Sequence, residues 1–202
     1  VLLKIEETLL KGISVRALDF SEKELGFVQS LQFITAKPVL YVCNVDENSA
    51  VSGNHYVEKI REAVKDENAE VIVLAVGTEA DITELDDFEE RQLFLKDIGL
   101  KEAGVSRLVR SAYKLLNLQT YFTAGEKEVR AWTISIGFTA PQAAGVIHTD
   151  FEKGFIRAET IAYDDYVAFG SESKVKEAGK MRVEGKDYIV KDGDVMHFRF
   201  NV

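Results

Sequence analysis

The first third of the chain alternates between stretches with helical spacing of apolar residues and short continuous apolar runs. Helical spacing is found in VLLKIEETLLKG at 1–12 and again in SEKELGFVQSLQFI at 21–34. The second stretch opens with Ser21 and Glu24, whose spacing predicts a capping box in the first turn of the helix. The N-terminal segment is therefore predicted to form two helices joined by an irregular connection.

Two continuous apolar runs follow, PVLYVC at 38–43 and EVIVLAV at 70–76. Both are short and rich in β-branched residues, as expected for strands that are covered on both faces. Between them, YVEKIREAVKDENA at 56–69 has its apolar residues on one face of a helix. A strand, a helix and a second strand in this order predict a parallel βαβ unit.

Two more helices are predicted before the pattern changes. LDDFEERQLFLKDIGL at 85–100 opens with acidic residues, which favour a helix N-terminus, and VSRLVRSAYKLL at 105–116 has the clearest apolar stripe of the chain. From residue 118 onward, short runs of β-forming residues predominate. Only PQAAGVIHTDFEKG at 141–154 has helical spacing there, so a small sheet with one helix is predicted. KDGD at 191–194 predicts a tight turn between the last strands.

With 202 residues, of which 46% are hydrophobic, the chain is long enough for one large core or two small ones. No run reaches the ~18 apolar residues that a membrane-spanning helix needs, and no cleavable signal is present, so a soluble cytoplasmic protein is expected. The lone cysteine, Cys43, is interpreted as an inert buried thiol. Because the chain opens at Val1 inside a predicted helix, it is expected to be part of a longer protein.

The negative charge is concentrated in the first part of the chain. Residues 1–117 carry 14 Lys and Arg against 21 Asp and Glu, whereas residues 118–202 carry 11 against 13. This distribution argues against non-specific nucleic-acid binding by the whole surface. It leaves room for a local basic face on the second part.

The residue pattern predicts neither a metal site nor a phosphate-binding loop. The three histidines, His55, His148 and His197, stand apart, and no cysteine or carboxylate is placed at metal-ligand spacing. His148 is interpreted as a hydrogen-bonded core residue of the predicted helix, and the acidic series 79–90 as a solvated surface. The pattern GxxxxGK[ST] does not occur.

The strand predicted at 38–43 is followed by NVDE at 44–47. In an open parallel sheet, ligands bind beyond the carboxyl ends of the strands, which is where Asn44 and Glu47 are expected. An amide there can hydrogen-bond a purine ring nitrogen, and a carboxylate can accept hydrogen bonds from the edge of the base. The spacing alone favours a plain surface turn over a nucleotide site.

Long stretches of the chain resemble the YchF family of Obg-related P-loop nucleotide hydrolases. These stretches are TAKPVLYVCNVDE at 35–47, FLKDIGL through AYDD at 94–165 and GKDYIVKDGDVMHFRFNV at 185–202. The resemblance implies an α/β fold in three parts. Residues 1–35 would end a helical-arm insertion, 36–117 would form the C-terminal part of a nucleotide-binding domain with a partial P-loop NTPase parallel sheet, and 118–202 would form a TGS domain, a ubiquitin-like β-grasp module.

The same resemblance implies a hydrolase that binds ATP or GTP with Mg²⁺ and prefers ATP. The phosphate loop and the magnesium ligands would lie in a part absent from this chain, so the chain alone is expected to be inactive and no catalytic residue is assigned. The guanine-reading N-K-x-D motif of related GTPases corresponds to NVDE: Asn44 retains the amide, Val45 replaces the lysine and Glu47 replaces the aspartate. Ala75 and Val76 stand where the family usually has Ser-Ala, which leaves backbone N–H groups for contact with a base.

Family members associate with ribosomes, so the resemblance implies a ribosomal partner and contacts to RNA or protein through the TGS domain. The candidates for a basic face with one aromatic residue are Lys127, Arg130, Trp132, Lys153 and Arg157. Strand alternation can place some of them on opposite sides. The alternative function is a non-catalytic RNA- or protein-binding β-grasp module.

Overall fold

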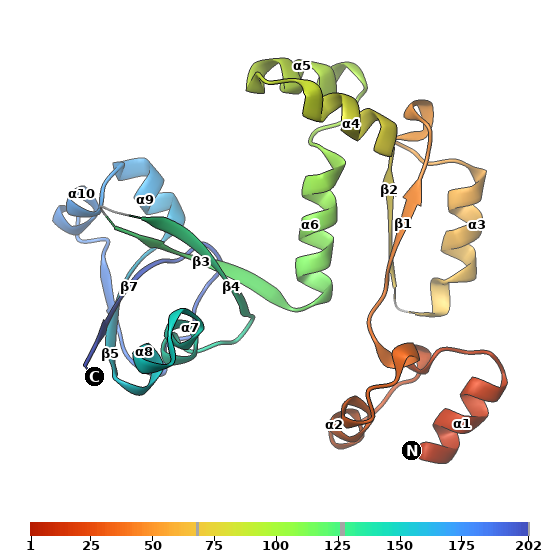
Figure 1. Ribbon diagram of the computed structural model, residues 1–202, viewed down its shortest axis with the longest axis horizontal. Coiled ribbons are helices and arrows are strands. Elements are labelled where there is room, and N and C mark those ends of the chain that lie inside the picture. Colours follow the sequence, from red (N-terminus) through yellow and green to blue (C-terminus); the bar gives the residue numbers. More distant parts are fainter. Residues whose placement is uncertain (68, 126–127, 202) are drawn as a thin grey trace. The chain divides into compact units, whose positions relative to one another are not determined.

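The computed structural model describes residues 1–67, 69–125 and 128–201. The chain forms two compact units, Val1–Leu115 and Leu116–Val202, drawn in Figure 1. The division lies close to residue 118, where the residue pattern changes. None of the helices in the described part is long and apolar enough to cross a membrane.

The N-terminal segment of the first unit is helical, as predicted. Its elements are α1 (Leu2–Leu10), η1 (Val15–Ala17), α2 (Glu22–Ser30) and η2 (Ile34–Ala36). Ile5, Val15 and Val28 form its buried core. The predicted capping box is confirmed. The Glu24 carboxylate accepts a hydrogen bond from the Ser21 backbone N–H at 2.9 Å, and the Ser21 side chain contacts the backbone of Glu24, the third residue of the helix.

The rest of the first unit contains the predicted parallel strand pair. Its elements are β1 (Leu40–Asn44), η3 (Glu47–Ser49), α3 (His55–Ala63), η4 (Lys65–Glu67), β2 (Glu70–Leu74), α4 (Val76–Glu84), α5 (Phe88–Asp97) and α6 (Gly104–Leu115). β1 and β2 are parallel, in a register that runs from Leu40 opposite Glu70 to Asn44 opposite Leu74. α3 and α6 lie on opposite sides of this pair (Figure 1).

Two boundaries and two burial predictions need correction. β1 begins at Leu40 rather than at Pro38, and β2 ends at Leu74 because Val76 already begins α4. β1 is not covered on both faces, since Val42 is 45% exposed, whereas every residue of β2 is half-buried or buried. Cys43 is half-buried rather than buried. The apolar stripe of α6 is also partly open, and 54% of Val105 is exposed.

The second unit is built on a five-stranded sheet with the order β4-β3-β7-β5-β6. The strands are β3 (Leu118–Ala124), β4 (Val129–Ser135), β5 (Phe155–Ile161), β6 (Arg182–Glu184) and β7 (Val195–Phe200). The central pair, β3 and β7, is parallel, and the other pairs are antiparallel. The first and last strands thus lie side by side in the middle of the sheet, which is the predicted β-grasp arrangement.

The helix predicted over 141–154 is divided into two helices, α7 (Ala140–Ile147) and α8 (Thr149–Lys153). The break falls at His148, which has an extended backbone with φ −160° and ψ 142°. The prediction that His148 belongs to the core is wrong, because its side chain is 60% exposed. It instead caps α8, where its Nδ1 accepts a hydrogen bond from the Asp150 N–H at 3.2 Å.

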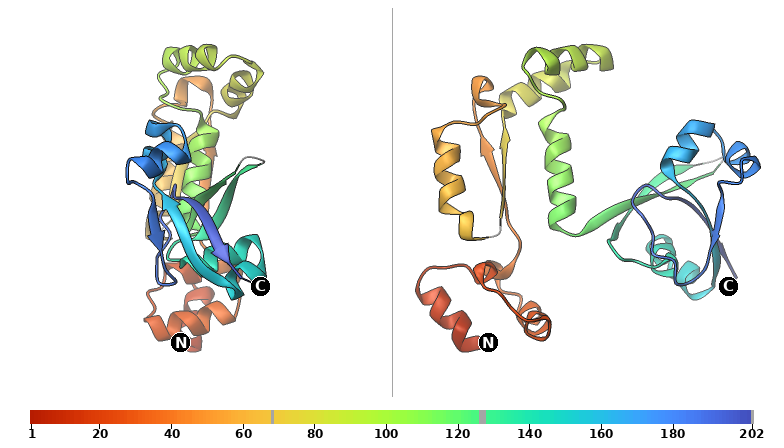
Figure 2. Two further views of the ribbon diagram at one scale, coloured as in Figure 1. Left: turned by 90° about the vertical axis from the view of Figure 1, so that its left-hand side faces the viewer. Right: turned by 180° about the vertical axis from the view of Figure 1, so that it is seen from behind.

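Two short helices of the second unit were not predicted, α9 (Tyr163–Phe169) and α10 (Glu172–Glu177). Figures 1 and 2 show them on the side of the sheet opposite α7 and α8. They cover the part of that face where Ile161, Val175 and Val195 form a second small core. Helices of seven and six residues are too short for a periodic signal.

The turn predicted at KDGD is confirmed. The Asp194 N–H donates to the Lys191 carbonyl at 3.1 Å, and Gly193 has a φ of +82°. This left-handed conformation favours glycine over residues with a Cβ.

Candidate nucleotide-base site and partner-binding surfaces

Two segments that sequence analysis assigned to one site meet at the carboxyl ends of β1 and β2. Asn44 ends β1, and Val76 begins α4 directly after β2. The Asn44 Oδ1 accepts a hydrogen bond from the Val76 backbone N–H at 3.1 Å. The Val45 N–H donates to the Leu74 carbonyl at 2.9 Å, which extends the strand pairing by one residue. The fold thus brings these residues together across 32 positions of sequence.

The orientation of the Asn44 amide follows from this bond. A backbone N–H can only donate, so the oxygen of the carboxamide must face Val76. The Asn44 Nδ2 therefore faces away from α4, and it donates to none of the described residues. Since Asn44 is exposed, this NH₂ group is available to a hydrogen-bond acceptor from solvent or from a ligand.

The two carboxylates that follow Asn44 have different surroundings. The Asp46 Oδ1 accepts a hydrogen bond from the Ser49 N–H at 3.1 Å and thereby caps η3. Glu47 is exposed, and its carboxylate accepts no hydrogen bond from any described residue. Asp46 accounts for the surface turn, whereas Glu47 is the carboxylate that remains free for a ligand.

After β2, the groups available to a ligand are backbone groups rather than side chains. Ala75 is only 4% exposed, so its methyl group is closed off from a ligand. Val76 is 50% exposed and is the first residue of α4, which has no side-chain cap from Ala75. The Asn44 carboxamide takes the place of that missing cap by accepting from the first N–H of the helix.

Sequence reasoning missed the function of Glu79. It assigned this residue to a solvated acidic series, but the Glu79 carboxylate accepts hydrogen bonds from the backbone N–H groups of Gly104 at 2.6 Å and Val105 at 3.3 Å. These groups are the unpaired donors at the start of α6. The sequence KEAGVS offers no N-cap side chain before Gly104, and this gap is the signal that a cap must come from elsewhere.

Two further hydrogen bonds hold α6 along β2. The Arg107 Nη2 donates to the Val73 carbonyl at 3.1 Å, and the Ser111 hydroxyl donates to Glu70 at 3.0 Å. Together with Glu79, they fix α6 at its start and along its length. The segment of β2 and α4 that contains the candidate base-side residues is therefore bonded directly to α6, the helix that leads to the second unit.

In the second unit, the candidate residues of β4 form a stacked pair. The guanidinium of Arg130 lies 4.1 Å from the centre of the Trp132 ring, and the Trp132 Nε1 donates to the Thr123 hydroxyl at 2.9 Å. Arg130 is exposed, whereas Trp132 is half-buried against the core. Lys127 lies outside the described residues.

The remaining candidates do not join this pair on one face. Trp132 is paired with Tyr121, which is buried on the side of the sheet covered by α7. Arg157 is paired with Arg199 on β7, and Arg199 shares the opposite side with Val195. Lys153 is the last residue of α8. The expected single basic face is therefore divided between the two faces of the sheet.

Comparison with known proteins places the whole chain in one group. A family model named YchF-GTPase_C and described as a protein of unknown function (DUF933) matches residues 118–201. The chain is 57% identical over 188 residues to the ribosome-binding ATPase YchF of Escherichia coli O157:H7, an alignment that covers 93% of this chain and 51% of the relative. The Bacillus subtilis protein of the same name is 52% identical over 204 residues, covering 100% of this chain and 56% of the relative.

The structure of the Schizosaccharomyces pombe YchF GTPase matches with a TM-score of 0.84 at 36% identity, covering 98% of this chain and 53% of that one. The chain belongs to the YchF family. It spans about half the length of the curated YchF relatives that it matches.

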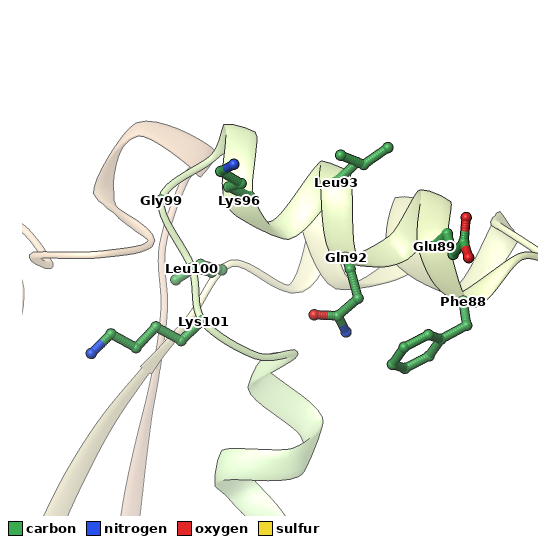
Figure 3. A pocket seen from close by; sticks show the side chains of 8 residues that line it. All are labelled: Phe88, Glu89, Gln92, Leu93, Lys96, Gly99, Leu100 and Lys101. Carbon is green, nitrogen blue, oxygen red and sulfur yellow. The ribbon is translucent and has the colours of Figure 1, made fainter.

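This YchF-family chain also has an open groove of about 700 Å³ beside α5. Figure 3 shows Phe88 and Gln92 projecting from the same side of α5, with Lys101 in the following loop. Phe88 is 70% exposed and Leu93 61%. Neither Asn44 nor Val76 lines the groove, so it is distinct from the candidate base-side residues.

Proposed function

We propose that this chain supplies the base-recognition part and the partner-binding part of a ribosome-associated purine nucleotide hydrolase that prefers ATP to GTP. Its bacterial relatives bear the name ribosome-binding ATPase, and the S. pombe relative is titled a GTPase. Because the chain spans about half of such relatives, the phosphate loop and the Mg²⁺ ligands are proposed to belong to the other half. Such a protein would work in the cytoplasm, where ribosomes are.

The hydrogen bond between Asn44 and Val76 carries this proposal. It leaves the Asn44 NH₂ group directed outward at the edge of the sheet where ligands of parallel sheets bind. Adenine and guanine both have a ring nitrogen, N7, that accepts such a hydrogen bond. Asn44 can therefore hold a purine without selecting between the two bases.

The choice between adenine and guanine depends on Glu47 and Val45. Guanine presents two donors to a carboxylate, whereas adenine offers one donor and one ring acceptor. Glu47 is longer than aspartate by one methylene, so an edge-to-edge fit with the two guanine donors is lost. Val45 is half-buried and has no long stem to cover the base. A good bidentate base contact is worth about 1–3 kcal/mol, and its loss makes adenine acceptable.

A double substitution tests this selection in a protein that carries both this chain and the other half of its relatives. Val45→Lys with Glu47→Asp should shift the ratio of ATP to GTP affinity toward GTP by about 5- to 150-fold, equivalent to the energy of one bidentate contact. The measurement is competition of ATP and GTP for a fluorescent nucleotide analogue.

The matched control is Val51→Lys with Glu84→Asp, which makes the same chemical changes at exposed positions outside NVDE. The control should keep the original preference. An unchanged ATP preference in the Val45/Glu47 variant would show that NVDE is a plain surface turn and does not select the base.

For the second unit we propose a TGS domain that contacts the partner. Its ubiquitin-like strand order and its own buried core support this assignment. The same observations also fit the alternative function, a non-catalytic RNA- or protein-binding module. The two functions are separated by nucleotide binding: only the hydrolase requires that Asn44→Ala in the complete protein weakens ATP binding while ribosome association persists.

A further inference from the structure

Two arginines lie directly opposite each other on an open part of the sheet of the second unit. Arg157 of β5 is paired with Arg199 of β7. Their side chains are 52% and 49% exposed. They lie on the face opposite α7 and do not belong to the second small core beneath α9 and α10.

Like charges directly opposite each other on neighbouring strands destabilise a sheet, so this pair needs a negative charge nearby. Glu159 supplies it: its Oε2 lies 3.0 Å from the Arg199 Nη2 and its Oε1 lies 3.9 Å from the Arg157 Nη2. The hydrogen bond from Arg199 lowers the pKa of the Glu159 carboxyl, with smaller contributions from the neighbouring charges. One carboxylate thus serves two guanidinium groups.

The compensation is incomplete in charge and in hydrogen bonding. Two guanidinium groups against one carboxylate leave a net positive charge, and His197 lies opposite Glu159 on β7. Each guanidinium has five N–H donors, of which Arg199 uses one and Arg157 has only a loose ion pair to Glu159. Among the described residues the two guanidinium groups have no other hydrogen-bond partner, and both side chains are about half exposed.

We propose that Arg157 and Arg199 bind two phosphate groups of RNA on this face. The proposal rests on the proposed ribosome association and identifies where and how the second unit makes its contact. The whole chain has a net charge of −9, so it is repelled by RNA unless a local positive group is presented. Guanidinium groups match phosphates bidentately, which makes an arginine pair better suited to them than lysines.

The surroundings favour RNA over an acidic protein surface. Protein interfaces are anchored by buried aromatic or large apolar side chains. Glu159 and His197 lie beside the arginine pair on these two strands, and the exposed apolar residues next to it, Ile156 of β5 and Val183 of β6, are aliphatic and provide no aromatic anchor. On the other face, the Arg130 guanidinium already stacks on Trp132.

The test measures binding of the 202-residue chain to purified 70S ribosomes and to purified ribosomal RNA over a range of salt concentrations. Arg157→Gln with Arg199→Gln should weaken binding to the ribosome and to ribosomal RNA by about tenfold. It should also make the negative slope of log K against log salt less steep by about 1.4 to 1.8, which corresponds to two phosphate contacts. The matched control, Lys174→Gln with Lys176→Gln, removes the same charge from α10 and should change the slope by less than half as much.

A second variant guards against loss of folding. Glu159→Gln keeps both arginines and removes the competing carboxylate, so it should bind ribosomal RNA more tightly than the parent chain. A purely structural ion pair predicts no such gain. Circular dichroism and thermal unfolding of each variant show that the comparison is made between folded chains.

The outcomes separate this inference from the proposed function. Equal weakening by the arginine and lysine variants, or binding to 70S ribosomes without binding to ribosomal RNA, overturns the arginine site and leaves ribosome association standing. Arginine-dependent binding of labelled polyglutamate as tight as that of RNA overturns the RNA assignment in favour of an acidic protein. If the parent chain binds neither ribosomes nor ribosomal RNA, both the inference and the proposed partner fail.

Discussion

The Glu79 carboxylate and the Gly104 backbone N–H are joined by a hydrogen bond of 2.6 Å that connects α4 to the start of α6. α4 begins at the candidate base-side residue Val76, and α6 leads to the first strand of the second unit. A side chain from one helix thus serves as the N-terminal cap of another. Loss of this bond is therefore expected to destabilise both α4 and the start of α6.

Removal of this cap should destabilise the first unit. Substituting an N-terminal capping side chain by alanine costs about 0.5–2 kcal/mol, so Glu79→Ala is expected to lower the free energy of unfolding by that amount. Urea unfolding followed by circular dichroism measures it. Glu84→Ala, at an exposed position of the same helix, is the control and should have little effect. Equal losses in the two variants would show that the cap contributes nothing.

A side chain at Gly104 should displace two neighbouring side chains. A Cβ there would overlap the Leu74 Cδ2 and lie 2.6 Å from the Glu79 Oε1. Overpacking of this kind costs about 1–3 kcal/mol, so Gly104→Ala should lower the thermal unfolding midpoint. Gly26→Ala is the matched control, because a Cβ at that position of α2 meets nothing within 4 Å. Since alanine favours a helix interior by about 0.5–1 kcal/mol over glycine, this control should stabilise the chain.

Tyr188 and Asp194 form a pH-sensitive pair in the second unit. The Tyr188 hydroxyl donates to the Asp194 Oδ2 at 2.7 Å, and Asp194 is only 3% exposed. Burial, followed by this bond, raises the pKa of Tyr188 to about 12. Because the folded pKa lies above the unfolded value, the contribution is complete below about pH 10 and is lost as the pH rises toward 12.

Tyr188→Phe removes both effects. It should lower the free energy of unfolding at pH 7 by about 1–3 kcal/mol, because a buried acceptor loses one donor. It should also reduce the loss of stability between pH 10 and 12, where the parent tyrosine titrates. Unfolding curves recorded across this range test both points. An identical alkaline profile in parent and variant would contradict the assignment to Tyr188.

The chain by itself should hydrolyse neither ATP nor GTP. Phosphoryl transfer depends on positioned phosphates and Mg²⁺, and the sequence lacks the phosphate-loop pattern. Release of phosphate by the purified chain is the measurement, with a protein that includes the other half of the YchF relatives as the positive control. Magnesium-dependent turnover that persists through further purification would overturn this prediction.

The second unit should fold alone. Its main core is formed entirely by its own residues, among them Tyr121, Ala144 and Phe198. A chain of residues 116–202 is therefore expected to give dispersed amide signals in a ¹H–¹⁵N NMR spectrum. Collapsed signals would show that this core needs the first unit.

The amino-acid sequence by itself determined the features that depend on residues close together in the chain. The capping box of Ser21 and Glu24 and the turn at Gly193 arise from local hydrogen bonds and allowed dihedral angles, so spacing and residue type suffice to predict them. The parallel strand pair is also local in this sense, because two apolar runs joined by one helix have few other ways to bury themselves.

Only the tertiary structure decided which side chains meet over long distances. The Oδ1 of Asn44 reaches the Val76 N–H, and Glu79 caps Gly104 25 residues later, because the ends of separate elements converge. Arg157 and Trp132 lie on opposite faces because the register of four strands, and not the sequence around either residue, sets their direction. Such contacts depend on the packing of the whole unit, which no local pattern records.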